Sequence, residues 1–367
     1  MAEMPIHVIV AAAGFAAGLA FGATAQRTNF CTMGAISDMV LMGNRNRFRA
    51  WVLAIAVAIL GSQALHLLGF VDLGKSIYLT PNLGWAGAIL GGLLFGFGMT
   101  MTGGCGNKTL VRVGGGSLKS LVVLLCLGIA AYATLRGVFG MLRQPLEAAT
   151  NLNLTTLGIP RQGVTDIVAA GTGLGAPGIR LALTALVAGG FLYYCFRDAD
   201  FRASRRDLAA GLIIGALVPA GWLITGLLGA DAFDPTPLAS FTFVAPIGDT
   251  VQYAMTFTGA KINFGIASVL GVVAGAFLAA LAAGELRLEG FADAGDTLRH
   301  IVGGVLMGIG GVLALGCTIG QGITGMSTLA LGSIIAWLSI LAGGYFGIKY
   351  LEEGSFAGAL RAVFARG

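Results

Sequence analysis

Apolar segments of about 20 residues, the length that crosses a lipid bilayer, recur along this sequence. The composition agrees, because 56% of the residues are hydrophobic and only 11% are charged, whereas charged residues approach about a quarter of a soluble domain. Nine such segments lie at about 6–24, 49–70, 84–101, 118–140, 179–196, 207–229, 264–283, 298–315 and 328–349. The sequence therefore predicts an all-α integral membrane protein with about nine transmembrane helices.

Basic residues in the connections set the expected orientation. If all nine segments span, most of the 22 Lys and Arg residues fall on one side of the membrane. The positive-inside rule makes that side cytoplasmic, so the N-terminus is expected outside and the C-terminus in the cytoplasm. A cytoplasmic surface that faces membrane lipid accounts for the basic isoelectric point of about 9.1, and no nucleic acid partner is needed.

Two stretches of sequence repeat between the halves. GGLLFGFGMTMTGGC at 91–105 aligns with GGVLMGIGGVLALGC at 303–317, and AAGLAFGA at 16–23 resembles AAGLIIGA at 209–216. Four predicted spans in each half, joined by a fifth, make equivalent helices run in opposite directions. We therefore expect two inverted-topology repeats, an arrangement that places transporter substrate sites near the membrane midplane. The expected parts are a first membrane repeat over 1–140, an external connection plus a linking transmembrane helix over 141–206, and a second membrane repeat over 207–367.

Polar residues among glycines interrupt two of the apolar segments, at TGGCGNK (Thr102–Lys108) and at LGCTIGQ (Leu315–Gln321). Backbone that leaves helical geometry at membrane depth must line a cavity or be buried in protein. We therefore expect re-entrant broken helices that turn back toward the membrane centre. A helix that restarts there directs free N–H groups and the positive end of its dipole at an anion. Lys108 and Arg112 follow the first break and the neutral Gln321 follows the second, so an anion is expected to be held by charge at one and by neutral donors at the other.

Three of the five cysteines lie at predicted helix breaks: Cys31, Cys105 and Cys317. Cys31 occurs in the polar stretch QRTNFCTMG, whereas VPAGWLITG at 218–226, taken as the equivalent part of the second half, has no cysteine. The other two cysteines lie among apolar neighbours, where Cys packs as a small hydrophobic residue. The position of the three beside glycine and polar residues favours a functional role over packing.

Three kinds of thiol chemistry could use these cysteines. No CxxC or Cys-x-x-His spacing occurs, so we expect no metal site. A redox enzyme needs paired thiols and usually a quinone or haem, and no second thiol lies near any of the three in sequence, so no cofactor is expected either. Neutral S–H groups can instead act as weak donors along a path for an anion that carries sulfur. A fixed positive charge in the constriction would hold a dianion too tightly for release.

Three longer stretches resemble, in order, the motifs of the YeeE/YedE family of bacterial inner-membrane proteins. They are QRTNFC at 26–31 with SDM at 37–39, GGCGNKTLVR at 103–112, and GCTIGQGITGMSTLALGS at 316–333. The resemblance covers nearly the whole chain. It implies an hourglass-shaped, inverted-repeat protein of the bacterial cell inner membrane, with a periplasmic N-terminus and a cytoplasmic C-terminus.

The resemblance also implies a function. Family members take up thiosulfate through a central constriction, and the cysteines that match Cys31, Cys105 and Cys317 pass the ion along by S–H hydrogen bonds. A small cytoplasmic sulfur-carrier protein similar to TusA is the implied partner. Relatives that act on other sulfur or selenium compounds leave those substrates as alternatives, and a membrane thiol oxidoreductase or sulfurtransferase is a further one. The chain has no Walker motif, so we expect it to hydrolyse no ATP itself. We expect a transporter and not an enzyme.

Further substrate-binding candidates come from the residues beside the breaks. Lys108 and Arg112 are expected to attract the anion, and Asn107, Thr318 and Gln321 are expected to donate hydrogen bonds to its oxygens. The alternative is a purely structural role, with the two basic residues anchoring the cytoplasmic side and the other three capping helices.

Overall fold

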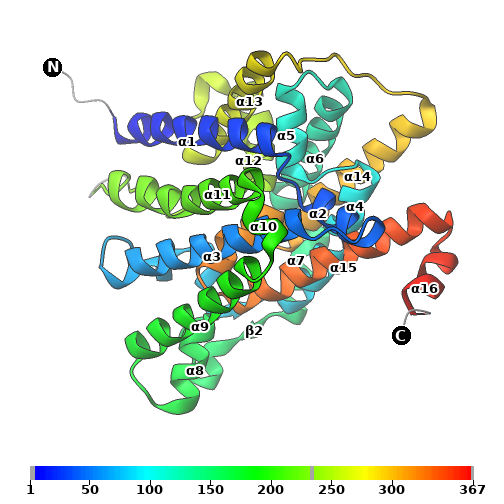
Figure 1. The fold of residues 1–367 in the computed structure, drawn as a ribbon. Coiled ribbons are helices and arrows are strands. Elements are labelled where there is room, and N and C mark those ends of the chain that lie inside the picture. Colours follow the sequence, from blue (N-terminus) through cyan, green and yellow to red (C-terminus); the bar gives the residue numbers. More distant parts are fainter. Residues whose placement is uncertain (1–4, 232–234, 365–367) are drawn as a thin grey trace.

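The structure is a computed structural model that describes residues 5–231 and 235–364. Its long helices lie side by side as a bundle, and α16 (Phe356–Phe364) lies at the end of the bundle opposite the start of α1 (Ile6–Thr28) (Figure 1). Among the described residues, eight helical segments are long and apolar enough to cross a membrane. This confirms the predicted all-α integral membrane protein.

The eight segments coincide with eight of the nine predicted spans. They are α1 (Ile6–Thr28) with α2 (Thr32–Leu41), α3 (Asn46–Leu67), α4 (Trp85–Met101) with α5 (Gly106–Gly114), α6 (Leu118–Arg136), α9 (Ala176–Phe196), α11 (Arg205–Leu223) with the π-helical turn η4 (Ile224–Leu228), α13 (Phe264–Ala283) and α15 (Leu331–Glu353). The ninth prediction, 298–315, coincides with the helix α14 (Ala294–Leu313), whose first turns carry Asp296, Arg299 and His300 and are therefore less apolar.

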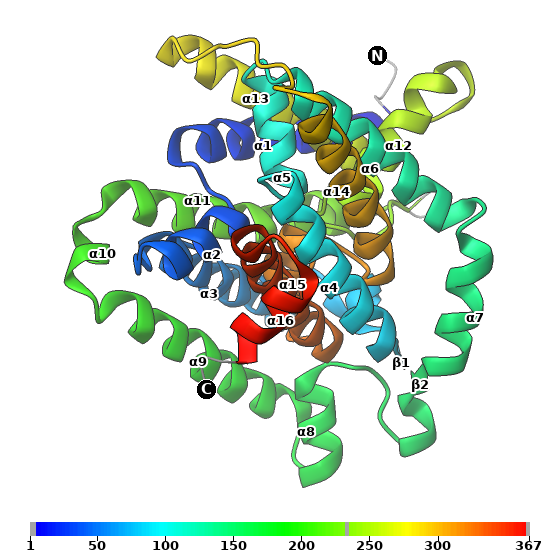
Figure 2. The same ribbon diagram turned by 90° about the vertical axis from the view of Figure 1, so that its right-hand side faces the viewer.

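Shorter elements connect these helices. They are η1 (Leu73–Lys75), η2 (Ile77–Leu79), β1 (Asn82–Leu83), α7 (Gly140–Thr150), β2 (Leu152–Asn153), η3 (Leu154–Leu157), α8 (Val164–Thr172), α10 (Ala199–Ala203), α12 (Val244–Met255), η5 (Phe257–Gly259) and η6 (Gly320–Gly325). The strands β1 and β2 pair antiparallel. The predicted external connection consists of α7, β2, η3 and α8, each too short to span a bilayer, and Figure 2 shows α7, α8 and α9 at the edge of the bundle.

Helix packing repeats between the two halves with the partners exchanged. Helix α1 packs on α13 and α11 packs on α3, while α4 packs on α15 and α14 packs on α6. At the centre, α4 and α14 pack on each other. Two halves related by a two-fold axis produce this exchange. If α1 corresponds to α11 and α3 to α13, the axis turns the contact of α1 with α13 into the contact of α11 with α3. The packing is the arrangement that inverted repeats require.

Glycine permits the closest of these helix crossings. A Cβ atom built on Gly22 of α1 would lie 2.0 Å from the carbonyl oxygen of Val272, and one built on Gly215 of α11 would lie 2.7 Å from that of Ala54. Both distances are too short for any side chain. Gly22 and Gly215 belong to the AAGL repeat found in the sequence, so the repeated glycines make equivalent contacts in the two halves.

Candidate functional site

Three cysteines occupy the same local position at three helix breaks: Cys31, Cys105 and Cys317. Two residues before each of them the backbone is left-handed, with φ of 54° at Asn29, 65° at Gly103 and 57° at Leu315. This conformation ends one helix and turns the chain so that another begins at the cysteine. The cysteines cap the first turns of α2 and α5 and of the helical turn that leads into η6.

The sulfur atoms bond to the restarted helices. The thiol of Cys31 accepts a hydrogen bond from Gly34 N at 3.5 Å, and that of Cys317 accepts one from Gly320 N at 3.4 Å. Cys105 Sγ donates to Asn107 Oδ1 at 2.5 Å. The first two contacts are those of a serine N-cap with sulfur in place of oxygen. All three cysteines are free thiols and at most 4% exposed.

The two re-entrant elements meet at these cysteines. The thiols of Cys31 and Cys105 face each other. Cys105 also faces the hydroxyl of Thr318, the residue that follows Cys317. These contacts bring together Cys31, Cys105 and Thr318, which are far apart in sequence. We refer to these residues and the neighbouring Cys317 as the file.

Two of the predicted donors in this file have unused hydrogen-bonding capacity. Asn107 and Thr318 are fully buried. Within the described residues, Asn107 Nδ2 and Thr318 Oγ1 have no hydrogen-bond partner. A buried donor without a partner costs about 1–3 kcal/mol. Both groups are therefore positioned to donate to a ligand that carries acceptor oxygens.

A basic cavity opens beside Cys31 at one end of the file. Its volume is about 420 Å³, and its lining includes Arg47, Lys108 and Arg112. Lys108 Nζ donates to Asn29 Oδ1 at 2.8 Å, and Arg112 Nη1 donates to the carbonyl of Thr102 at 3.4 Å. The two predicted anion-attracting residues thus both line this cavity.

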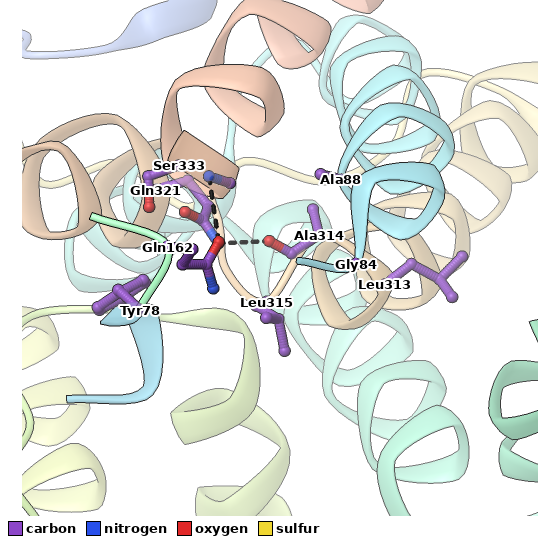
Figure 3. A pocket seen from close by; sticks show the side chains of 10 residues that line it. Tyr78, Gly84, Ala88, Gln162, Leu313, Ala314, Leu315, Gln321 and Ser333 are labelled. Carbon is purple, nitrogen blue, oxygen red and sulfur yellow. Dashed lines mark hydrogen bonds between the residues drawn. The ribbon is translucent and has the colours of Figure 1, made fainter. Parts of the chain in front are cut away.

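A second cavity lies between the start of α4 and the end of α14, where Gly84 and Leu313 line it (Figure 3). Arg47 at the start of α3 borders the first cavity and Tyr78, beyond the end of α3, borders the second. Gly103, after the end of α4, lines the first cavity, and Gly84, before its start, lines the second. The second cavity measures about 20 Å³, which is room for roughly one water molecule. Because of this small volume, we call it the closed cavity.

Two glutamines shape the closed cavity. Gln162 Oε1 accepts a hydrogen bond from Gly332 N at 3.2 Å, and Gln321 Nε2 donates to the carbonyl oxygen of Ala314 (Figure 3). The remaining oxygen of Gln321, Oε1, is buried and has no partner among the described residues. The predicted site residue Gln321 thus lies on this cavity, at the opposite end of the bundle from Lys108.

Sequence reasoning missed the polar residues near Cys317. Tyr78 and Gln162 carry no recognisable pattern, because they come from connecting loops that only the fold brings to the second break. The expected counterpart of the Cys31 break was also misplaced. Residues 218–226 remain helical, since α11 continues directly into the π-helical turn η4.

Comparisons with known proteins agree with the resemblance found in the sequence. The family described as sulphur transport matches residues 27–346. The thiosulfate transporter TsuA of Escherichia coli is 28% identical over 321 residues, which are 84% of this chain and 86% of the relative. TsuA of Spirochaeta thermophila is 27% identical over 341 residues, 90% of this chain and 96% of the relative. The probable transporter YedE of Escherichia coli is 34% identical over 97 residues, 26% of this chain and 22% of that protein. The chain belongs to the sulphur transport family.

Proposed function

We propose that this protein carries thiosulfate across the bacterial inner membrane into the cytoplasm, along the file of Cys31, Cys105 and Cys317. The observation that carries the proposal is that helix breaks from the two halves each have a buried cysteine at the turn, and that Cys105 of the first half lies beside both Cys31 and Thr318, the neighbour of Cys317. Two relatives that span most of the chain are named thiosulfate transporters, which supports the choice of substrate.

The chemistry of the file suits transfer better than tight binding. A thiol is a weak, uncharged donor, so an anion can bind to one and move to the next. Asn107 and Thr318 would bind its oxygens through Nδ2 and Oγ1, which have no hydrogen-bond partner among the described residues. Because the cysteines and these two residues are uncharged, they would not bind the anion too tightly for release.

The basic cavity beside Cys31 is proposed to face the cytoplasm. Arg47, Lys108 and Arg112 line it, and the positive-inside rule assigns such a concentration of charge to the cytoplasmic side. The N-terminus is then periplasmic and the C-terminus cytoplasmic. Lys108 and Arg112 would draw the anion out of the file, and a TusA-like sulfur-carrier protein would meet the protein at this end.

Uptake of labelled thiosulfate by cells that express the protein tests the proposal. We expect the initial rate to fall at least tenfold in Cys105→Ala and Cys317→Ala, because a hydrogen bond to a charged group contributes roughly 1.5–3 kcal/mol. Cys126→Ala is the matched control, since Cys126 lies in α6 outside the file. Undiminished uptake in both path variants would refute the thiol mechanism.

A covalent sulfur-transfer role is the second candidate, because the fold places the free thiols of Cys31 and Cys105 face to face. These cysteines are 105 − 31 = 74 residues apart in sequence, and only the fold brings them together. Serine keeps a hydrogen-bond donor but no nucleophilic sulfur. Cys105→Ser should therefore retain measurable uptake in a transporter, whereas persulfide on Cys105 in mass spectra and complete loss in the serine variant would favour covalent transfer.

A further inference from the structure

The second half contains a counterpart of the Cys31 break that has a hydroxyl in place of the thiol. NFCTMGAISD at 29–38 aligns with SFTFVAPIGD at 240–249, which places Cys31 against Thr242. Identical residues recur at three positions of this alignment: Phe30 and Phe241, Ile36 and Ile247, and Asp38 and Asp249. The offset is 242 − 31 = 211 residues, next to the 317 − 105 = 212 residues that separate the two Gly-Cys elements.

Helix packing independently identifies the same counterpart. Helix α2, which begins after Cys31, packs on α3 and α15, and α12 packs on α13 and α6. Because α3 corresponds to α13 and α15 to α6, α12 is the counterpart of α2. The N-cap of α12 is Phe243, one residue after Thr242. The ring of Phe243 packs against Phe21 at 5.2 Å between centroids, so the polar group of this break comes from Thr242.

Thr242 contacts Cys317 as Cys31 contacts Cys105. Its hydroxyl faces the thiol of Cys317 and the hydroxyl of Tyr78. A Cβ atom built on Gly320 would lie 2.4 Å from Thr242 Oγ1 and 3.5 Å from Tyr78 Oη. Both hydroxyls therefore lie against the backbone turn whose Gly320 N–H binds Cys317 Sγ. Tyr78 also lines the closed cavity, so its side chain connects that cavity with Thr242.

We propose that the hydroxyl of Thr242 is a further substrate-binding group, which receives the anion from the closed cavity and delivers it to Cys317. The proposal rests on the proposed function and extends it to a path with two matched pairs of donors, Thr242 with Cys317 and Cys31 with Cys105. A hydroxyl donates to an anionic oxygen more strongly than a thiol does. The external pair thus binds oxygen-rich anions first, before the thiols take over.

Uptake rates of threonine variants test this assignment. Thr242→Val removes the hydroxyl at nearly constant volume, and we expect the initial rate of thiosulfate uptake to fall roughly tenfold, the loss of one hydrogen bond to a charged group. Thr242→Ser restores the hydroxyl, and its uptake rate should stay within about twofold of wild type. Thr242→Cys should take up thiosulfate faster than Thr242→Val, because its thiol can donate a hydrogen bond as Cys31 does. Thr134→Val is the matched control, because Thr134 is a buried threonine in α6 whose hydroxyl bonds within its own helix at 2.7 Å.

The outcomes separate this inference from the function on which it rests. Wild-type uptake in Thr242→Val, with uptake lost in Cys317→Ala, would overturn the role of Thr242 and leave the thiol path intact. Equal losses in Val and Ser would overturn it too, because the hydroxyl would then not matter. If Thr242→Val does not insert, Thr242→Ala against Thr242→Ser makes the same comparison. Absence of uptake by the wild-type protein would refute the proposed function and this inference together.

Discussion

The crossing of α4 and α14 gives the sharpest test of the packing. A Cβ atom on Gly310 of α14 would lie 2.6 Å from the carbonyl oxygen of Gly91 and 2.6 Å from the amide nitrogen of Phe95, both on α4. Both contacts are to backbone, so no side chain can rotate away. To reach the 3.4 Å of an ordinary contact the helices must separate by about 3.4 − 2.6 = 0.8 Å.

The variant Gly310→Ala is therefore expected to destabilise the protein by about 1–3 kcal/mol, the usual cost of overpacking. It should also lower transport, because α4 and α14 end at Met101 and Leu313, immediately before the two Gly-Cys breaks. A shift of this crossing moves Cys105 relative to Cys317, and displacements of this size disturb positioning in binding sites.

Thermal unfolding in detergent, followed by loss of monodisperse protein, measures the effect. Gly189→Ala is the matched control, since Gly189 lies in α9 and a Cβ atom there would meet nothing within 4 Å. Alanine should be neutral or stabilising at this exposed position, because it is the better helix former. If Gly310→Ala proves as stable as Gly189→Ala, the close helix contact on which the reasoning depends does not exist.

Three further predictions concern the breaks and the loops. Leu315→Val should be about 1–2 kcal/mol less stable than Leu315→Gly in thermal unfolding, because a β-branched residue resists the left-handed φ of 57°; equal stabilities would contradict the strain. Added thiosulfate should raise the thermal stability of Lys108→Met several-fold less than that of wild type at low ionic strength, and this difference should shrink at high salt. If the effect of thiosulfate has the same salt dependence in both proteins, Lys108 does not contact the anion. The hydrogen bond from Lys119 holds the pKa of Glu289 below its ordinary value. This contact therefore stabilises at neutral pH, and the contribution is lost as the pH falls through the lowered pKa. The small advantage of wild type over Glu289→Gln should therefore be present at pH 7 and vanish in acid, and an advantage that persists in acid would contradict the assignment.

Much of the membrane architecture could be predicted because hydropathy acts over whole segments. The nine predicted spans each coincide with a helix, even at α14, where Asp296 and Arg299 make the first turns polar. The Gly-Cys breaks were also visible, since glycine at 103 suits a left-handed turn. Leu315 adopts the same conformation with no such signal, and only its alignment with Gly103 indicates it.

Parts of the candidate site depend on how the chain returns to the centre. The AAGL repeat has an offset of 209 − 16 = 193 residues, whereas Thr242 and Cys31 are offset by 211. Between its first helix and Thr242, the second half thus has 211 − 193 = 18 more residues than the first half has between its first helix and Cys31. The turn η4 is among them. Alignment from the first helix alone therefore selects 218–226, which is helical. Gln162 reaches Gly332 from a loop 170 positions away, and no local pattern encodes that contact.

The dependence of each break on the opposite half has a consequence for biogenesis. Helix α5 packs on α13, and η6 packs on α3, so each re-entrant turn rests on a helix that the other half supplies. When the ribosome has delivered only the first repeat, α5 has no α13 to pack on. The two turns must consequently reach their final packing after both repeats have been inserted, and a chain truncated between them would present quality-control proteases with an unfinished, exposed turn.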